Sequence, residues 1–288
     1  MFNQNIKTPV NIPVSKIHPF EGNPYKVLDN DEMNSLICSI QEQGILTPII
    51  IRPIENTDEY EVISGHRRLH ATVKAGMKEV PAFIYAVTRD EAAIMLVDSN
   101  LHREHILPSE RAFAYKLKAE ALKHQGKRSD LTSVQVAPKL ATEQIGVTES
   151  ISKDTVKRYI RLTYLIPELL ELVDEKKIAL TPAVELSYLT DEEQYSLLGS
   201  IEVEDRTPSL SQAVRFKKLS QAGELSDENI ETIMQEDKAN QKPMFKVSIE
   251  RLQKVAPKVK DKDFEDFVLK ACEHYYKFLL RQRDRDSR

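Results

Sequence analysis

The sequence predicts an α+β domain first, an all-α helix-turn-helix domain next, and a mainly helical region at the C-terminal end. Strand-like alternation, as in Tyr60 to Ser64, is concentrated in the first hundred residues. From Pro108 onward, apolar residues recur mostly at helical spacing. Between residues 139 and 165, a short helical run, a glycine and a second, capped run follow in helix-turn-helix order. The expected domains are residues 1–100, 101–198 and 199–288.

Length and composition limit the class of protein. A chain of 288 residues, 41% of them hydrophobic, is long enough for two or three domains with apolar cores. With a net charge of −4, nucleic-acid binding has to depend on local basic patches. Cys38 and Cys272 form no CxxC pair, which argues against a zinc site or disulfide framework and fits a reducing cytoplasm. No segment reaches the ~20 apolar residues of a membrane span, so no membrane partner is expected.

The first domain is expected to alternate strands with short helices. The expected strands are 10–14, 45–52, 60–64 and 80–85, and the expected helices are 31–43, 69–75 and 88–97. Gly44 stands where a helix C-terminal cap belongs, and Thr88 is available as an N-terminal cap. These elements predict a compact α+β unit of about 100 residues.

The junction at Gly65 has the features of a phosphate site. A strand stops at this glycine, Arg67 and Arg68 follow, and a helix begins at Leu69. Glycine allows the backbone to approach a ligand, and a helix N-terminus offers free N–H groups to an anion. The arginines add charge and forked donors. The plainer alternative, given equal weight, is that the two arginines only solvate the start of a helix.

A polar connector follows the first domain. Within residues 98–109, Asn100 is a candidate metal or phosphate ligand and Arg103 a candidate phosphate clamp. The alternative, an ordinary linker between domains, is favoured for these two residues taken alone.

The middle domain contains the candidate DNA-reading helix. Residues 109–123 are expected to be helical and 125–138 to form a mobile loop; a helix over 139–145 then ends at Gly146. Ser152 is expected to cap a helix running to about Leu165. Ser152, Lys153 and Lys157 would meet base edges or phosphates, with Arg158 and Arg161 on the DNA backbone. The alternative is a solvated charged face.

The rest of the chain is expected to be helical except for one strand. The expected helices are 167–173, 181–189, 191–198, 209–219, 226–236 and 262–283, and the strand is 244–249. The last helix carries an apolar stripe, which must be buried against its own domain or a partner chain.

These motifs, in this order, resemble those of the ParB family of partition proteins, which are CTP-binding DNA clamps. The family motif Gly-Glu-Arg-Arg-x-Arg-Ala corresponds to Gly65–Ala71, and Glu-Asn-x-x-Arg-Glu corresponds to Ser99–Glu104. A first family box corresponds to Tyr25-Lys26 followed by Gly44–Pro48, without its arginine. Residues 152–162 resemble the family's recognition helix, so the resemblance covers roughly residues 10–190.

The resemblance implies that the first domain is a ParB-like domain that binds CTP with Mg²⁺. The implied nucleotide-binding residues are Gly65, His66, Arg67, Arg68, Asn100 and Arg103, with Asn100 also contacting the metal. Ser99 replaces the glutamate implicated in hydrolysis, so CTPase activity is expected to be slow or absent. His66 and His70 replace a glutamate and an arginine, and are expected either to titrate near neutrality or to be passive substitutes.

The implied function is site-specific DNA binding in plasmid or chromosome partition, as a nucleotide-dependent clamp on a plasmid or mobile element. The implied partners are a palindromic double-stranded DNA site, a second copy of the chain in a homodimer, and a ParA-type ATPase. The implied location is the cytoplasm, on the nucleoid or plasmid. Two alternatives remain open: a helix-turn-helix transcriptional regulator without nucleotide switching, and a nuclease on the same N-terminal fold.

Overall fold

The computed structural model describes residues 8–103, 105–129, 137–236, 248–257, 259–260 and 263–286. The chain packs as two compact units, Met1–Glu236 and Asp237–Arg288. The boundary predicted at residue 198 falls inside a helix, α9 (Asp191–Glu204). The three ranges therefore remain a prediction about function, and the two packing units are described one at a time.

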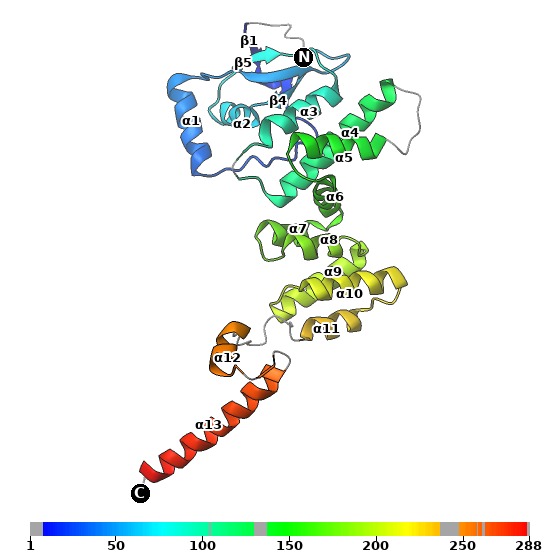
Figure 1. Ribbon diagram of the computed structural model, residues 1–288. Coiled ribbons are helices and arrows are strands. Elements are labelled where there is room, and N and C mark those ends of the chain that lie inside the picture. The colour runs from blue at the N-terminus through cyan, green and yellow to red at the C-terminus, as the bar shows by residue number, and fades with distance from the viewer. Residues whose placement is uncertain are drawn as a thin grey trace. The chain divides into compact units, whose positions relative to one another are not determined.

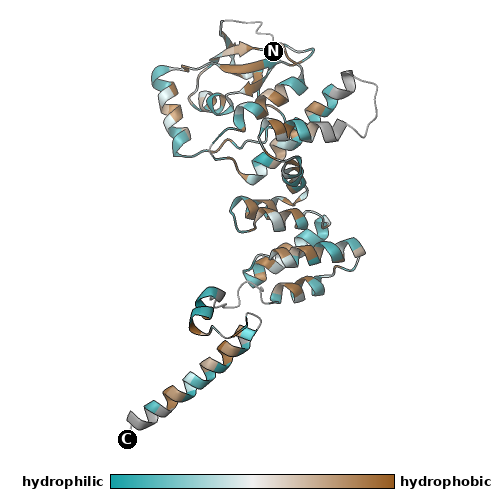
Figure 2. Cartoon of the chain, in the orientation of Figure 1, coloured by the Kyte–Doolittle hydropathy of each residue, from teal (hydrophilic) through white to brown (hydrophobic). Residues whose placement is uncertain are grey.

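A five-stranded sheet forms the top of the first unit in Figure 1. The strands are β1 (Val10–Pro13), β2 (Ile17–His18), β3 (Ile49–Pro53), β4 (Tyr60–Ser64) and β5 (Glu79–Ile84), in the order β1-β5-β3-β4-β2. Pairs β1/β5 and β3/β4 are antiparallel, whereas β3/β5 and β2/β4 are parallel. The strands are largely hydrophobic in Figure 2, and Ile49, Ile51 and Val62 are fully buried. This sheet confirms the predicted α+β domain.

Three helices accompany the sheet: α1 (Asp31–Gln43), α2 (His66–Lys74) and α3 (Arg89–Asn100). The Asn30 side chain caps α1 by accepting from Met33 N at 3.0 Å, and Thr88 caps α3 in a capping box with Glu91. Helix α2 starts three residues before the predicted Leu69, directly after Gly65. Helix α3 continues three residues past the predicted end, so that Asn100 is its last residue.

The rest of this unit is helical. Its helices are α4 (Pro108–Ser129), α5 (Ala137–Thr148), α6 (Lys153–Arg161), a 3₁₀ turn η2 (Leu162–Tyr164), α7 (Pro167–Asp174), α8 (Leu180–Leu186), α9, α10 (Leu210–Ala222) and α11 (Asp227–Gln235). The predicted loop over 125–138 is wrong for residues 125–129, where α4 continues, and for 137–138, where α5 begins; residues 130–136 lie outside the described part. Leu169, Leu197 and Phe216 belong to a buried cluster that joins η2 to α11.

Gly146 has a different role from the predicted helix end. Helix α5 passes through it to Thr148, and the turn is made by Ser150, whose φ is 55°. A Cβ at residue 146 would lie 2.8 Å from Ile151 O and 3.3 Å from Lys153 N. The glycine is therefore needed because the start of α6 approaches α5 closely.

We expect Gly146→Ala to destabilise the first unit by about 1–3 kcal/mol, because backbone must move to admit the methyl group. Gly199→Ala is the matched control: it also lies inside a helix, α9, and its added Cβ meets nothing within 4 Å. That change should instead stabilise by about 1 kcal/mol through helix propensity. Urea unfolding followed by circular dichroism measures both, and equal effects of the two changes would contradict the close approach.

The second unit contains α12 (Ile249–Val255) and α13 (Phe264–Asp286). Of the predicted strand 244–249, residues 244–247 lie outside the described part, and Ile249 begins α12. Large apolar side chains are exposed along α13, namely Phe267, Leu269, Tyr275, Tyr276, Phe278, Leu279 and Leu280. A helix with this surface is suited to packing against a partner. Within the described residues, no helix has the length and apolar character needed to cross a membrane.

Candidate functional site

Three separated segments meet at one small hollow beside the start of α2. Its lining residues are Asn23, Tyr25, Lys26, Val27, Gly65, His66, Arg67, Asn100 and Arg103. They come from the loop before α1, from the β4–α2 junction, and from the end of α3 with its following connector. Five of the six predicted nucleotide-binding residues are therefore brought together.

The β4–α2 junction is built around Gly65. Its φ is 103°, in the left-handed region, and a Cβ there would lie 2.7 Å from Ile49 Cγ2. Only glycine fits this position without strain. Because the first backbone N–H that bonds back into the helix is that of Leu69, to Gly65 O at 2.9 Å, the preceding N–H groups remain available to an anion.

The two adjacent arginines diverge. Arg67 lines the hollow, and its NH2 group lies 3.0 Å from Glu32 Oε2 in a solvent-exposed ion pair. Arg68 instead donates from NH1 to Thr47 O and, at 2.7 Å, to Pro48 O. Its side chain thus satisfies the backbone before β3, and it is not one of the residues that line the hollow.

His66 is held neutral in the fold. Its Nε2 atom accepts a hydrogen bond from Phe20 N at 3.3 Å. Burial, followed by the nearby Arg103 charge, lowers the pKa of His66 to about 4, against a smaller opposing effect of Glu61. The expectation that His66 titrates near neutrality is therefore wrong. His70 points away from this histidine, with Nε2 2.8 Å from Asp29 Oδ1.

The lowered pKa of His66 predicts acid sensitivity. Between pH 6.5 and about 4, the unfolded chain binds a proton at this residue and the folded chain does not, so stability falls as the pH drops. The loss is about 3 kcal/mol when complete. The difference in urea midpoint between pH 7.5 and pH 5 should be smaller for His66→Gln than for the wild type. His102→Gln, which changes an exposed histidine, should keep the wild-type difference; an unchanged difference in His66→Gln would contradict the assignment.

Asn100 presents an oxygen suited to a cation. Its Nδ2 atom donates to Leu96 O at 2.7 Å and to Ser99 Oγ at 3.2 Å, so Oδ1 is the end of the amide that a cation could contact. A single amide oxygen fits Mg²⁺ when phosphate oxygens and water complete the shell. Arg103 lies over the ring of Tyr25, 5.6 Å from the centroid, and brings a second cation to the hollow. Among the described residues, no group of three or more His, Cys, Asp or Glu side chains is placed to hold a metal.

The hollow is closed in this conformation. Its volume is about 20 Å³, which is room for about one water molecule. Tyr25, Lys26 and Arg103 are among its lining residues. A ligand of nucleotide size would fit here only after side chains or the loop before α1 move.

Four of the predicted DNA-binding residues are exposed on α6 or at its N-terminal cap. Ser152 Oγ accepts from Thr155 N at 3.1 Å, which confirms the predicted cap. Lys153 pairs with Glu143 and Lys157 with Asp154 in exposed ion pairs, which are weak in water. Arg158 donates to Thr181 Oγ1 at 2.6 Å. All four side chains remain accessible to a ligand.

Arg161 is used differently. It donates from Nε to Ser187 Oγ at 3.1 Å and from NH2 to Ser187 O at 2.7 Å. Its guanidinium also lies 4.5 Å and 4.0 Å from the ring centroids of Tyr164 and Tyr188. These contacts tie the end of α6 to the end of α8, so Arg161 has a structural role in this conformation.

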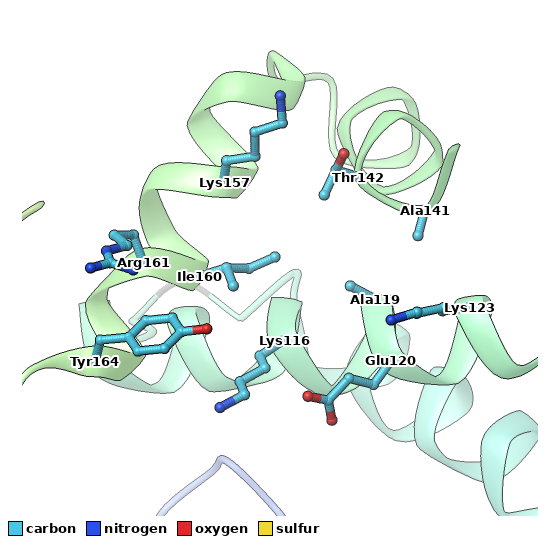
Figure 3. Close-up of a pocket in the computed structure, with 10 residues that line it drawn as sticks. All are labelled: Lys116, Ala119, Glu120, Lys123, Ala141, Thr142, Lys157, Ile160, Arg161 and Tyr164. Atoms are coloured by element: carbon cyan, nitrogen blue, oxygen red, sulfur yellow. The ribbon is translucent and has the colours of Figure 1, made fainter. Parts of the chain in front are cut away.

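A groove lies between α4, α5 and α6 (Figure 3); its walls are largely apolar, and we call it the basic groove for the lysines among its lining residues. The groove has a volume of about 570 Å³. Lys116, Lys123 and Lys157 face it from α4 and α6, together with the acidic Glu120. The positive charge continues that of α6 and supplies the local basic patch that an acidic chain needs to approach DNA.

Several residues at the hollow were outside the predicted set. Asn23, Tyr25, Lys26 and Val27 line it from the loop before α1. Tyr25 and Lys26 belong to the first family box, and that box was the signal that pointed to them. Asn23 and Val27 carry no motif, and only the folded path of the loop places them here.

Known proteins are similar to this chain over most of its length. Residues 2–101 match the family model of the ParB N-terminal domain. The chromosome-partitioning protein Spo0J of Thermus thermophilus is 32% identical over 209 residues, which span 73% of this chain and 70% of that protein. The nucleoid occlusion protein of Listeria innocua is 30% identical over 200 residues, spanning 69% of this chain and 64% of that protein, slightly under two thirds. A structure of C-terminally truncated ParB from Caulobacter crescentus complexed with CTP-gamma-S matches with a TM-score of 0.31 and 23% identity, over 67% of this chain and 98% of that one.

Proposed function

The chain belongs to the ParB family of partition proteins, and we propose that it binds a specific DNA site and closes on DNA as a CTP-dependent clamp in plasmid or chromosome partition. The observation that carries this proposal is the meeting of Gly65, Arg67, Asn100 and Arg103 at one hollow. Residues 65–67 and 100–103 are far apart in the sequence, and a phosphate chain is the ligand that explains their donors and charges together.

Each residue at the hollow has a proposed role in nucleotide binding. Gly65 lets the triphosphate approach the N–H groups of α2, and Arg67 leaves the exposed Glu32 to neutralise phosphate charge. Asn100 would hold Mg²⁺ through Oδ1, and Arg103 would contact phosphate from the connector. The metal would supply positive charge to neutralise the triphosphate. Ser99 offers no carboxylate to position a water, so we propose binding with slow or absent hydrolysis.

DNA binding is proposed for α6 and the basic groove beside it. Ser152, Lys153 and Lys157 lie on the N-terminal part of α6, where helix-turn-helix proteins contact base edges. Arg158 and the lysines of the groove are placed to contact phosphates. A second copy, joined through the exposed apolar face of α13, would give the two-fold symmetry that a palindromic site requires. A ParA-type ATPase as a further partner is proposed from family membership alone.

The proposal is tested by calorimetry of CTP, ATP, GTP and UTP binding with Mg²⁺, combined with selection of DNA from a randomised duplex pool. Selective CTP binding together with one enriched palindrome is the expected result. An enriched site without binding of any nucleotide would leave a helix-turn-helix regulator. Cleavage of the duplex with Mg²⁺ alone would instead identify a nuclease.

A further inference from the structure

The basic groove is lined by the same pattern of positions on two of its walls. Residues of α4 at i, i+3, i+4 and i+7 form one wall, namely Lys116, Ala119, Glu120 and Lys123. Residues of α6 and η2 at the same spacing form a second wall, namely Lys157, Ile160, Arg161 and Tyr164. Positions at this spacing share one face of a helix, and a rise of seven residues spans about 10 Å. The groove is therefore about two helical turns long.

The middle of the groove is apolar. In Figure 3 the Ile160 side chain points from α6 into the groove, toward Ala119 of α4 and Ala141 of α5. The groove volume, about 570 Å³, is in the range of sites that bury a ligand. Contact between a concave apolar surface and water is unfavourable, and apolar side chains of a partner would displace that water.

Positive charge lies at the ends of the walls. Lys116 and Lys123 stand at the two ends of the α4 wall, and no salt bridge within the described residues involves either of them. Lys157 begins the α6 wall, and its ion pair with Asp154 is exposed. Phosphate contacts explain these lysines but leave the apolar middle unexplained. The whole groove fits a ligand that is apolar on one face and acidic at its sides.

We propose that the basic groove docks an acidic amphipathic helix of a partner protein. The apolar face of that helix would cover Ile160 and Ala119, and its flanking carboxylates would pair with Lys116 and Lys123. This is the helix-in-groove mode of recognition. Lys157 is also a proposed DNA contact, so the helix and DNA would exclude each other. The docking goes beyond the proposed function, and only the exclusion of DNA rests on it.

Fluorescence anisotropy with the full chain and a fluorescein-labelled synthetic peptide tests the docking. The peptide is a helix of about four turns, with leucines on one face at i, i+3, i+4 and i+7 and glutamates elsewhere. We expect saturable binding in the micromolar range. A peptide of the same composition, with its leucines spread around the helix, should bind about tenfold more weakly or worse. Equal binding of both peptides, or no binding up to about 1 mM, would overturn the proposal.

Two variants test whether the peptide occupies the groove. Ala119→Gln fills the groove without a change of charge and should weaken peptide binding by about tenfold or more. Lys123→Glu replaces an attraction with a repulsion and should weaken it by about fivefold or more, even where Ala119→Gln unfolds. Lys218→Glu is the matched control, because it makes the same charge change at an exposed position of α10.

The control should keep the wild-type peptide affinity within about twofold. Wild-type affinity in both folded groove variants, or equal effects of Lys123→Glu and Lys218→Glu, would contradict docking in the groove. Self-association of the protein that Ala119→Gln abolishes in sedimentation would place a second copy there instead, and would also overturn the proposal.

Competition with the selected DNA duplex separates this inference from the proposed function. Saturating duplex should release the peptide, since both ligands use Lys157. A peptide that stays bound at full DNA occupancy would overturn the exclusion. If no duplex is selected from the pool, the proposed function fails, whereas peptide binding that depends on Ala119 and Lys123 still supports the docking.

Discussion

Arg52→Ala is expected to lower the free energy of unfolding of the first unit by about 3–5 kcal/mol. Arg52 Nε lies 2.7 Å from Glu61 Oε2, and both side chains are more than nine-tenths buried. Glu61 Oε1 also accepts from Glu21 N at 3.0 Å, so this carboxylate ties β3, β4 and the loop before α1 together. Removing Arg52 leaves a buried negative charge with one backbone donor, which costs far more than the lost contact.

Urea unfolding followed by circular dichroism measures this loss. Lys16→Ala is the control, because it breaks the Lys16–Asp58 ion pair at 2.6 Å on the exposed edge of the same sheet. Its urea midpoint should stay close to that of the wild type. In Arg52→Met combined with Glu61→Leu, much of the stability should return, since apolar residues can replace a buried pair. Similar losses for Arg52→Ala and Lys16→Ala would contradict the burial argument.

Arg67→Ala is expected to weaken CTP binding by about 30-fold or more, the usual effect of removing a charged partner of a phosphate group. Its stability should barely change, because the Arg67–Glu32 ion pair is exposed. Calorimetry with Mg²⁺ measures the affinity, and urea unfolding checks the fold. DNA-site binding without nucleotide should be retained, since the DNA contacts are proposed for α6.

Arg215→Ala provides the matched control for Arg67. Arg215 is also an exposed arginine paired with a glutamate, Glu236, but it lies on α10 and does not line the hollow. Its loss should leave CTP affinity within about twofold of the wild type. Equal effects of the two substitutions would show that net charge, rather than the position of Arg67, determines the affinity.

The sequence predicted which segments carry the site better than it predicted which side chains face it. The cap at Ser152, the strand ending at Gly65 and the helical repeat after Pro108 are local signals, and the structure has all three. Arg67 and Arg68 are adjacent and chemically identical, so no local pattern shows that only Arg67 lines the hollow. The difference comes from the carbonyl groups of Thr47 and Pro48, about 20 residues earlier in the chain.

Long-range partners account for the other differences. Arg161 donates a hydrogen bond to Ser187, 26 residues later. A helical pattern relates residues only a few positions apart, so it does not predict this pairing. The pKa of His66 follows from burial under the loop before α1, whose path the sequence does not specify. Gly146 is a helix-ending residue by propensity, but the close approach of α6 decides its role instead.

The closed hollow also has a kinetic consequence. Because about 20 Å³ cannot hold a nucleotide, the proposed binding would have to wait for side chains or the loop before α1 to move. The apparent affinity is then the intrinsic affinity multiplied by the fraction of open molecules, and the association rate reaches a plateau set by opening as the nucleotide concentration rises. At high nucleotide concentration, this opening step would set how often the protein binds nucleotide.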